Sequence, residues 1–257
     1  MNQTERRLFM IQYLQKERAD AATIAIPADS SAQRRLLRAL LNVRLPRPVS
    51  DEFLAVQDAY LQTELTHKGV TDIHQLLPVE PGLYLWQGDI TTLRCDAIVN
   101  AANSRLLGCF APNHACIDNC IHTFAGVQLR LACHELMQQQ GYPEPTGQAK
   151  ITPAYNLPCR YVLHTVGPII SAPVTPQDDE QLADCYRACL ALAAEKGLHS
   201  VAFCCISTGE FHFPNRRAAE IAVKTVRAFQ AQTPIEVIFN VFKDLDLEIY
   251  RRLLTEN

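Results

Sequence analysis

The sequence has no apolar run long enough to cross a bilayer and no long run of basic residues, and each absence excludes a class of protein. Because a membrane-spanning helix needs about 20 consecutive apolar residues, no membrane partner is expected. The N-terminal stretch MNQTERRLFMIQYLQKERAD turns polar too soon for a signal peptide, so we expect a cytoplasmic protein. With a formal net charge of -3, nucleic acid is not an expected partner either.

The chain also lacks internal repeats and low-complexity tracts. Its 257 residues, 48% of them hydrophobic, can bury a substantial core, as one large domain or as a domain with an extension. Ten cysteines would suit a disulfide framework only in a small secreted chain. Because several of them fall in apolar segments here, we expect reduced thiols. A monomer is a separate expectation.

Residues 1 to about 75 are predicted to be a helical extension. Leu8, Ile11 and Leu14 recur at helical spacing. Ser30 and Gln33 form a capping-box pattern before a second helix, and Ser50 can cap a third. Nothing in this part has the chemistry of a site. We therefore expect helices that pack against the main domain and cover one of its edges, with a partner-binding role as the alternative.

From residue 76 to 257 apolar strands alternate with helices, which predicts an α/β domain with a largely buried mixed sheet. The expected strands are Leu83 to Trp86, Ala97 to Asn100, Ala149 to Ala154, Tyr161 to Thr165, Ser200 to Ile206 and Glu236 to Phe242. The expected helices are Asn119 to Gln140, Asp179 to Lys196, one from Pro214 through Ala228 and a short one after Asp244.

Three soft metal ligands follow the second of these strands. Cys109, His114 and Cys116 have the spacing C-x4-H-x-C, and thiolate with imidazole is the ligand set that tetrahedral zinc prefers. Since a structural zinc normally has four protein ligands and a catalytic one has three, the spacing favours one catalytic zinc with an open position. Cys120 and His122 are expected in a helix behind the site. The alternative is that these are ordinary apolar cysteines beside a loop histidine.

Four separated motifs resemble, in order and spacing, the macrodomain family that binds ADP-ribose. They are GDIT (88–91), DAIVNAAN (96–103), HTVGP (164–168) and ISTGEFHFP (206–214), and the metal-ligand motif resembles the zinc-dependent branch of bacteria and fungi. The resemblance implies a three-layer α/β/α sandwich around a mixed, mostly parallel six-stranded sheet, with an N-terminal helical extension. It also implies an enzyme that removes ADP-ribose from mono-ADP-ribosylated proteins.

The strand ends indicate where a ligand would bind. In doubly wound sheets ligands collect at the carboxyl ends of the strands, and NAAN, HTVGP and STG each close or follow a strand. The backbone amides of Ser207, Thr208 and Gly209 could cradle a diphosphate. A helix starting at Asp118 would offer free amides at three further residues to the same anion, namely Asn119, Cys120 and Ile121.

The resemblance assigns the remaining site residues. It places Asp89 and the Ile90 backbone at the adenine amino group, and Phe211, after Glu210 in the same turn, at the distal ribose, although His212 stands where the family usually has glycine. It makes Asn103 the residue that holds a distal ribose hydroxyl and puts Asp118 beside the anomeric carbon, both as catalytic residues. Each has a plainer alternative: Asp89 and Asn103 as turn residues, and Asp118 as a helix cap.

The favoured function is therefore a zinc-dependent protein-ADP-ribose hydrolase. Two mechanisms stay open: zinc lowers the pKa of a bound water that attacks, or zinc grips the distal ribose while Asp118 polarises a water. Two other functions are weighed against it. One is an ADP-ribose reader with a structural zinc and no catalysis, and the other is a metal-free nucleotide-binding module.

Overall fold

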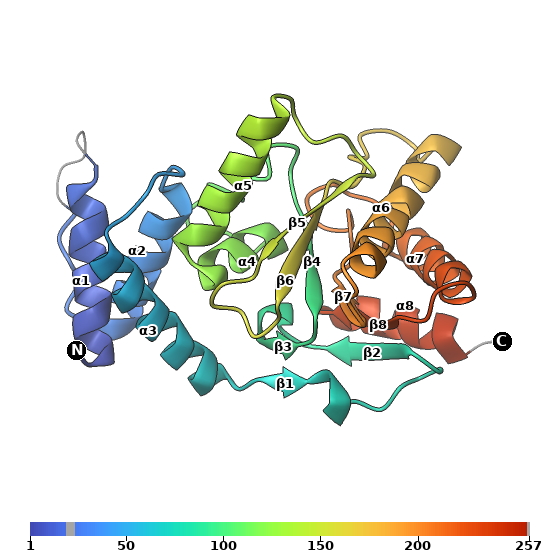
Figure 1. Ribbon diagram of the computed structural model, residues 1–257, viewed down its shortest axis with the longest axis horizontal. Coiled ribbons are helices and arrows are strands. Elements are labelled where there is room, and N and C mark those ends of the chain that lie inside the picture. Colours follow the sequence, from blue (N-terminus) through green and yellow to red (C-terminus); the bar gives the residue numbers. More distant parts are fainter. Residues whose placement is uncertain (19–23, 256–257) are drawn as a thin grey trace.

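The computed structural model describes residues 1–18 and 24–255, and its N-terminal part is a unit of three helices (Figure 1). These are α1 (Gln3–Lys16), α2 (Ser30–Val43) and α3 (Asp51–Lys68). Their apolar sides meet in a hydrophobic cluster of their own, around Met10, Leu37 and Phe53, apart from the cluster of the main domain. The three helices therefore bury their own core, as amphipathic helices must when they pack together.

The starts of two of these helices test the capping predictions. Ser50 caps α3 as expected, since its side chain accepts a hydrogen bond from the Phe53 amide. The capping box predicted at Ser30 is wrong: Asp29 caps α2. Gln33 instead accepts two hydrogen bonds from the guanidinium of Arg7, at 3.0 and 2.9 Å. A buried arginine needs such acceptors, and this demand overrides the local capping pattern.

The main domain is built on six strands, and all six were predicted. They are β2 (Leu83–Gln87), β4 (Ala97–Ala101), β5 (Ala149–Pro153), β6 (Tyr161–Thr165), β7 (Ser200–Phe203) and β8 (Glu236–Val241). Their order in the sheet is β2-β8-β7-β4-β6-β5, and every neighbouring pair is parallel except β5 with β6. The mixed, mostly parallel sheet is thus confirmed. Its central strands are buried on both faces, which is why they are continuous apolar runs.

Helices cover both faces of this sheet (Figure 1). On one side lie α4 (Ile117–Ala125) and α5 (Val127–Gln140), with α2 packed on α4. On the other side α6 (Pro176–Glu195) packs on α7 (Asn215–Gln230), which packs on α8 (Asp244–Thr255). This is the α/β/α sandwich that was expected.

A second sheet of two very short parallel strands was not predicted. It pairs β1 (Thr71–Asp72) with β3 (Leu93–Arg94), beside the 3-10 turns η1 (Ile73–Gln75) and η2 (Ile90–Thr92). Elements of two or three residues are too short to show a hydrophobic period, so the sequence carries no signal for them.

The helix predicted from Asn119 to Gln140 is in fact two helices that meet at Gly126. Gly126 has a φ of 98°, and a Cβ built on it would lie 2.6 Å from the amide nitrogen of Gln57 in α3. The same Gln57 side chain accepts a hydrogen bond from the first amide of α5, that of Val127. The break therefore depends on a residue of the N-terminal helices, which local helix signals cannot reveal.

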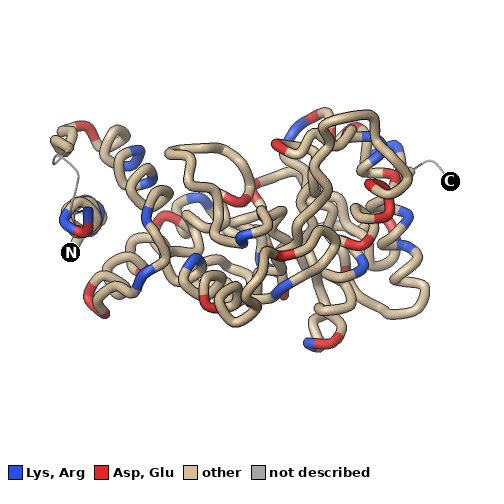
Figure 2. The backbone as a smooth tube through the Cα atoms, turned by 90° about the horizontal axis from the view of Figure 1, so that it is seen from above, with Lys and Arg blue, Asp and Glu red and all other residues tan. Residues whose placement is uncertain are grey.

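Among the described residues no helix is both long and apolar enough to span a membrane. Basic and acidic residues are interspersed along the whole described chain (Figure 2). All ten cysteines are free thiols, as predicted, and most of them are buried.

Candidate active site

The sequence motifs meet at one edge of the sheet, where the carboxyl ends of its parallel strands lie. The residue after β2, Gly88, donates its amide to the carbonyl of Val241 at the end of β8. Ala102, after β4, donates in the same way to Thr165 at the end of β6. Because parallel strands all end at the same edge, Asp89, Asn103 and Ser207 follow strands that share this edge. The expected convergence of these motifs is therefore present.

Asp118 lies at the centre of this edge, and two asparagines hold it. Asn100, in β4, donates to Asp118 Oδ1 at 2.8 Å, and Asn103 donates to Asp118 Oδ2 at 3.1 Å. Burial raises the pKa of Asp118 to about 6, although Asn100, the charge of Arg130 and Asn103 each lower it in part. A carboxyl group of this kind changes its protonation close to neutral pH, which suits a general base.

Asp118 is not the cap of its helix, so that alternative is wrong. Helix α4 begins at Ile117, with Cys116 at the N-cap position, and Asp118 lies in the first turn. The two asparagine side chains draw its carboxylate toward β4 and away from the free amides. The two asparagines of the NAAN motif thus hold the Asp118 carboxylate in one orientation. Asn103 also donates to the Gly108 carbonyl at 3.1 Å.

Two buried histidines lie behind Asp118. His164 contacts Asn100 at 3.2 Å through Nδ1 and Thr152 at 2.9 Å through Nε2, and burial lowers its pKa to about 3. His122 lies 3.5 Å from Asp118, and burial followed by the charge of Arg130 lowers its pKa well below the ordinary value. Both imidazoles are therefore neutral, and the contact between His122 and Asp118 is not an ion pair.

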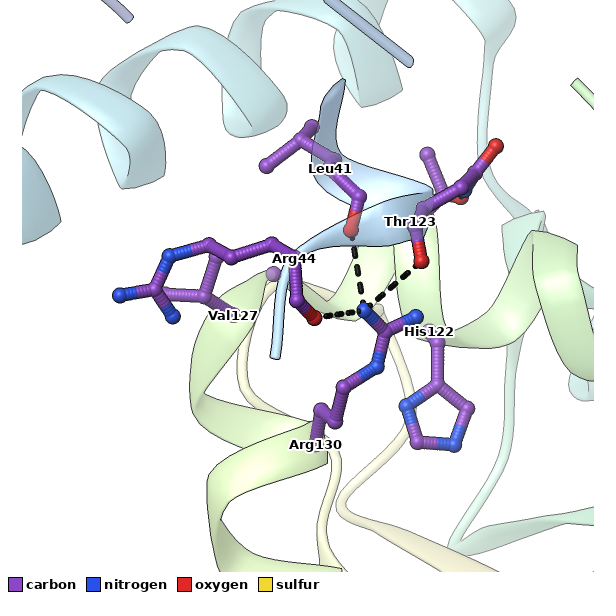
Figure 3. A pocket seen from close by; sticks show the side chains of 8 residues that line it. Leu41, Arg44, His122, Thr123, Val127 and Arg130 are labelled. Atoms are coloured by element: carbon purple, nitrogen blue, oxygen red, sulfur yellow. Dashed lines mark hydrogen bonds between the residues drawn. The ribbon is translucent and has the colours of Figure 1, made fainter. Parts of the chain in front are cut away.

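A small cavity separates these residues from the N-terminal helices (Figure 3). Arg130 of α5 projects into it and donates through one nitrogen to the carbonyls of Leu41, Asn42 and Arg44, at the C-terminal end of α2. The ring of His122 lies beside the guanidinium. The cavity is lined by residues of α2, α4 and α5 and therefore belongs to the junction between the two parts of the molecule.

The three predicted metal ligands come together. Their ligand atoms all lie within 4.8 Å of one another, and Cys109 Sγ is 3.6 Å from His114 Nδ1. Bond lengths of about 2.3 Å to sulfur and 2.05 Å to nitrogen in a tetrahedral zinc site place those two ligand atoms ~3.6 Å apart. Burial and the neighbouring Cys109 thiol raise the pKa of Cys116 to about 12, against a lowering contribution from the Asn119 amide. Because two thiols and an imidazole lie at this spacing, the three side chains fit a zinc ion.

Cys120 and His122 take no part in this cluster, in agreement with their predicted place behind it. Cys120 accepts a hydrogen bond from Arg38 of α2 at 3.4 Å. His122 is held by the turn that precedes the ligands: Gly108 has a φ of 79°, and a Cβ on it would lie 2.8 Å from the imidazole. Only glycine fits this approach, so the loop is packed directly on the histidine.

The free amides at the start of α4 are not those predicted. The Cys120 amide donates to the Cys116 carbonyl at 3.1 Å, and Ile121 lies one residue further into the helix, so neither is free for an anion. The Asn119 amide is directed at the Cys116 thiol, and its side chain at loop carbonyls. The amides left at this helix end are those of Ile117 and Asp118. The helix begins at Ile117 rather than at Asp118, so the prediction of free amides is wrong for Cys120 and Ile121.

The predicted phosphate-binding turn contains two non-glycine residues in the left-handed conformation. Ser207 has a φ of 64° and His212 a φ of 58°. The Ser207 hydroxyl is buried without a hydrogen-bond partner, and a Cβ on Gly167 would lie 2.0 Å from it. A Cβ on Gly209, in contrast, would meet nothing within 4 Å. The protein itself does not require glycine at 209, so any such requirement comes from a ligand.

Glu210 extends from this turn toward the metal cluster. Its carboxylate lies 3.5 Å from His114 Nε2, while His114 Nδ1 faces Cys109. A carboxylate on the second nitrogen of a metal-binding histidine holds the imidazole in one orientation and one tautomer. Glu210, placed among the substrate-binding residues from sequence, thus contacts a residue of the cluster.

The carboxylate of Asp89, which was predicted at the adenine end, already has partners within the protein. One carboxylate oxygen accepts from the amide and hydroxyl of Thr91, and the other pairs with Lys68 of α3 at 3.1 Å. Partial burial raises the pKa of Asp89, but Thr91 and Lys68 together hold it below its ordinary value. Asp89 is therefore an ionised acceptor, and Ile90 beside it is buried.

Two residues near Asp89 were missed from sequence. Lys68 lies over the ring of Phe124, 3.4 Å from its centroid, besides pairing with Asp89. Phe242, just after β8, is 75% exposed, and its carbonyl accepts a hydrogen bond from Gln87 at the end of β2. Phe242 was predicted as the last residue of β8, and its exposure became visible only in the structure, where β8 ends at Val241.

The chain is similar in sequence to known proteins. The profile of the macro domain matches residues 99–222. The chain is 55% identical to a protein-ADP-ribose hydrolase of Treponema medium, over 99% of this chain and 100% of that protein. It is 51% identical to a protein-ADP-ribose hydrolase of Staphylococcus aureus (strain Mu50), over 97% of this chain and 95% of that protein.

Solved structures of the same fold have been determined with nucleotides. A macrodomain of Oceanobacillus iheyensis with ADP superposes with a TM-score of 0.63 at 37% identity, covering 70% of this chain and 94% of that one. A Trypanosoma brucei macrodomain in complex with ADP-ribose superposes with a TM-score of 0.65 at 31% identity, covering 84% of this chain and 94% of that one.

Proposed function

Because this chain belongs to the macro domain family, we propose that it is a zinc-dependent hydrolase that releases ADP-ribose from mono-ADP-ribosylated proteins. The observation that carries the proposal is the position of Asp118. This buried carboxylate lies two residues beyond the last of three soft metal ligands and at the edge where the nucleotide-binding motifs meet. Relatives that are 51–55% identical are named protein-ADP-ribose hydrolases, and structures of the family contain ADP and ADP-ribose.

ADP-ribose would lie along the strand ends with its adenine at Asp89. The ionised Asp89 carboxylate can accept from an exocyclic amine, and the exposed ring of Phe242 offers a face on which a base can stack. The turn from Ser207 to Gly209 would receive the diphosphate, since the Ser207 hydroxyl is buried without a partner and Gly209 leaves space for a close approach, and Phe211 would lie at the distal ribose. The distal ribose would then face Asp118.

Asp118 would act on the water that attacks the ribose. With a pKa of about 6 it is mostly ionised at neutral pH, yet it retains enough basicity to take a proton. Asn100 and Asn103 hold one carboxylate oxygen each and so fix its orientation. Cys109, His114 and Cys116 would hold the zinc, and zinc, when bound, supplies a Lewis acid beside the reacting centre.

One experiment tests both the reaction and the metal. The protein is incubated with a mono-ADP-ribosylated protein, with and without a strong zinc chelator, while free ADP-ribose is measured. We expect release that stops with chelator and returns with added zinc. Cys116→Ala should lose zinc and activity together, whereas Cys120→Ala, in the same stretch but outside the cluster, should keep both. Tight ADP-ribose binding without release would indicate a reader instead.

A further inference from the structure

Helix α2 of the N-terminal unit contacts the loop that carries the three candidate metal ligands. Arg38 of α2 directs one guanidinium nitrogen, Nη2, at three groups of the main domain. It donates to the His114 carbonyl at 2.8 Å, to Asn119 Oδ1 at 3.0 Å, and approaches the Cys120 sulfur at 3.4 Å. A charged donor on the backbone of a ligand residue is a strong and directional contact.

A second residue of α2, Asn42, holds the same loop one turn further along. Its side chain is buried, accepts the amide of Asn113 at 2.9 Å and donates to the hydroxyl of Thr123 at 2.9 Å. Asn113 has a φ of 57°, a conformation that costs free energy unless its surroundings enforce it. The hydrogen bond from its amide to Asn42 thus stabilises the turn just before His114.

Asn119 extends this contact to the first ligand. Its side chain is fully buried; it accepts from Arg38 and donates to the carbonyls of Cys109 and Ala111, at 3.3 and 3.0 Å. Arg130 stacks on Phe110 in the same loop, 4.5 Å from the ring centroid, while it binds the last carbonyls of α2. The backbone of the loop is therefore tied to α2 directly at Asn113 and His114, and through Asn119 at Cys109 and Ala111.

We propose that α2 is part of the metal centre, with Arg38 as a positioning residue that holds the ligand loop ready for zinc. The proposal rests on the proposed function, because it takes Cys109, His114 and Cys116 as the zinc site. The loop between β4 and α4 has no regular secondary structure, so its order depends on contacts of this kind. A loop that is ordered in advance binds its metal more tightly, since less conformational entropy is lost on binding.

The test measures zinc binding rather than turnover. Zinc affinity of full-length Arg38→Met is determined by competition with a chromogenic chelator and compared with that of the unaltered protein. Outer contacts of metal sites contribute about 10–100-fold in affinity, so we expect a loss of that size. Arg35→Met is the matched control, because Arg35 is an exposed arginine on the same helix and should leave affinity unchanged. If Arg38→Met fails to fold, Arg38→Gln, whose polar tip is too short to reach the loop, replaces it.

A second measurement distinguishes positioning from a general loss of structure. Hydrogen exchange of the zinc-free proteins should show faster exchange in residues 109–116 of Arg38→Met, with α1 and α3 unchanged. Equal zinc affinity and equal exchange in Arg38→Met and the unaltered protein would overturn the positioning role while leaving the proposed function intact. Failure of the unaltered protein to bind zinc through Cys116 would instead overturn the zinc-dependent function itself, and the inference with it.

Discussion

Asp118→Asn should make the protein more stable and far less active at neutral pH. The pKa of Asp118 is raised to about 6 from an ordinary value of 3.8, because the carboxyl group is buried. One pKa unit corresponds to about 1.4 kcal/mol, so the ionised carboxylate lowers the free energy of unfolding by about 3 kcal/mol above pH 6. An asparagine carries no charge and removes this cost.

The substitution also loses one hydrogen bond. The new amide oxygen can still accept from Asn100, but the amide nitrogen would face the donor nitrogen of Asn103. A lost hydrogen bond costs about 1 kcal/mol, so the net gain is about 2 kcal/mol. In a domain of this size that amounts to a melting temperature about 4–8 °C higher.

The pH dependence follows from the direction of the shift. An acid whose folded pKa exceeds its unfolded value keeps more protons in the folded state, so its destabilising effect grows as pH rises through the window from about 4 to 6. The difference in melting temperature between Asp118→Asn and the unaltered protein should therefore be complete at pH 7 and vanish near pH 4. Zinc-free protein is used, so that the metal does not alter the local field.

Turnover is measured on the zinc-loaded proteins. Removal of a general base typically costs about 10² to 10⁴ in rate, so ADP-ribose release by Asp118→Asn should fall by at least 10²-fold. Greater stability together with lower activity would separate the catalytic carboxylate from a residue with only a structural role. A lower melting temperature at pH 7, or unchanged turnover, would refute the reasoning.

Three further predictions concern the remaining parts of the site. Asp89→Ala should weaken ADP-ribose binding by about 1–3 kcal/mol in calorimetry, because it removes a charged acceptor. Gly209→Ala should leave the melting temperature of the ligand-free protein unchanged, since its Cβ meets nothing within 4 Å. The same Cβ should block the approach of the diphosphate and weaken ADP-ribose binding at least ~10-fold. Arg130→Met should lower the free energy of unfolding by about 2–3 kcal/mol in urea titrations, because it leaves carbonyls at the end of α2 without their donor. A change below about 1 kcal/mol would mean that water replaces the guanidinium.

The strands of the sheet and the grouping of the three candidate metal ligands could be predicted from the sequence alone. The four central strands, β8, β7, β4 and β6, are apolar runs that are almost entirely buried, and a buried strand can hardly be encoded in any other way. Cys109, His114 and Cys116 lie close together in the chain, so a single loop brings them together. Asn103 and Ser207 come two and four residues after the ends of β4 and β7, and parallel pairing of these strands then places both motifs at one edge.

The helix break, the pKa of Asp118 and the contacts of the ligand loop, in contrast, depend on the tertiary structure. The break between α4 and α5 depends on Gln57, about 70 residues earlier in the chain, and the raised pKa of Asp118 depends on burial beneath several elements. The hydrogen bond from Arg38 to the His114 carbonyl joins two residues that are 76 positions apart in the sequence. Interactions of this kind are made by residues far apart in the chain, and no local spacing or propensity records them. The N-terminal helices, which carry no site motif, therefore became part of the site only through packing.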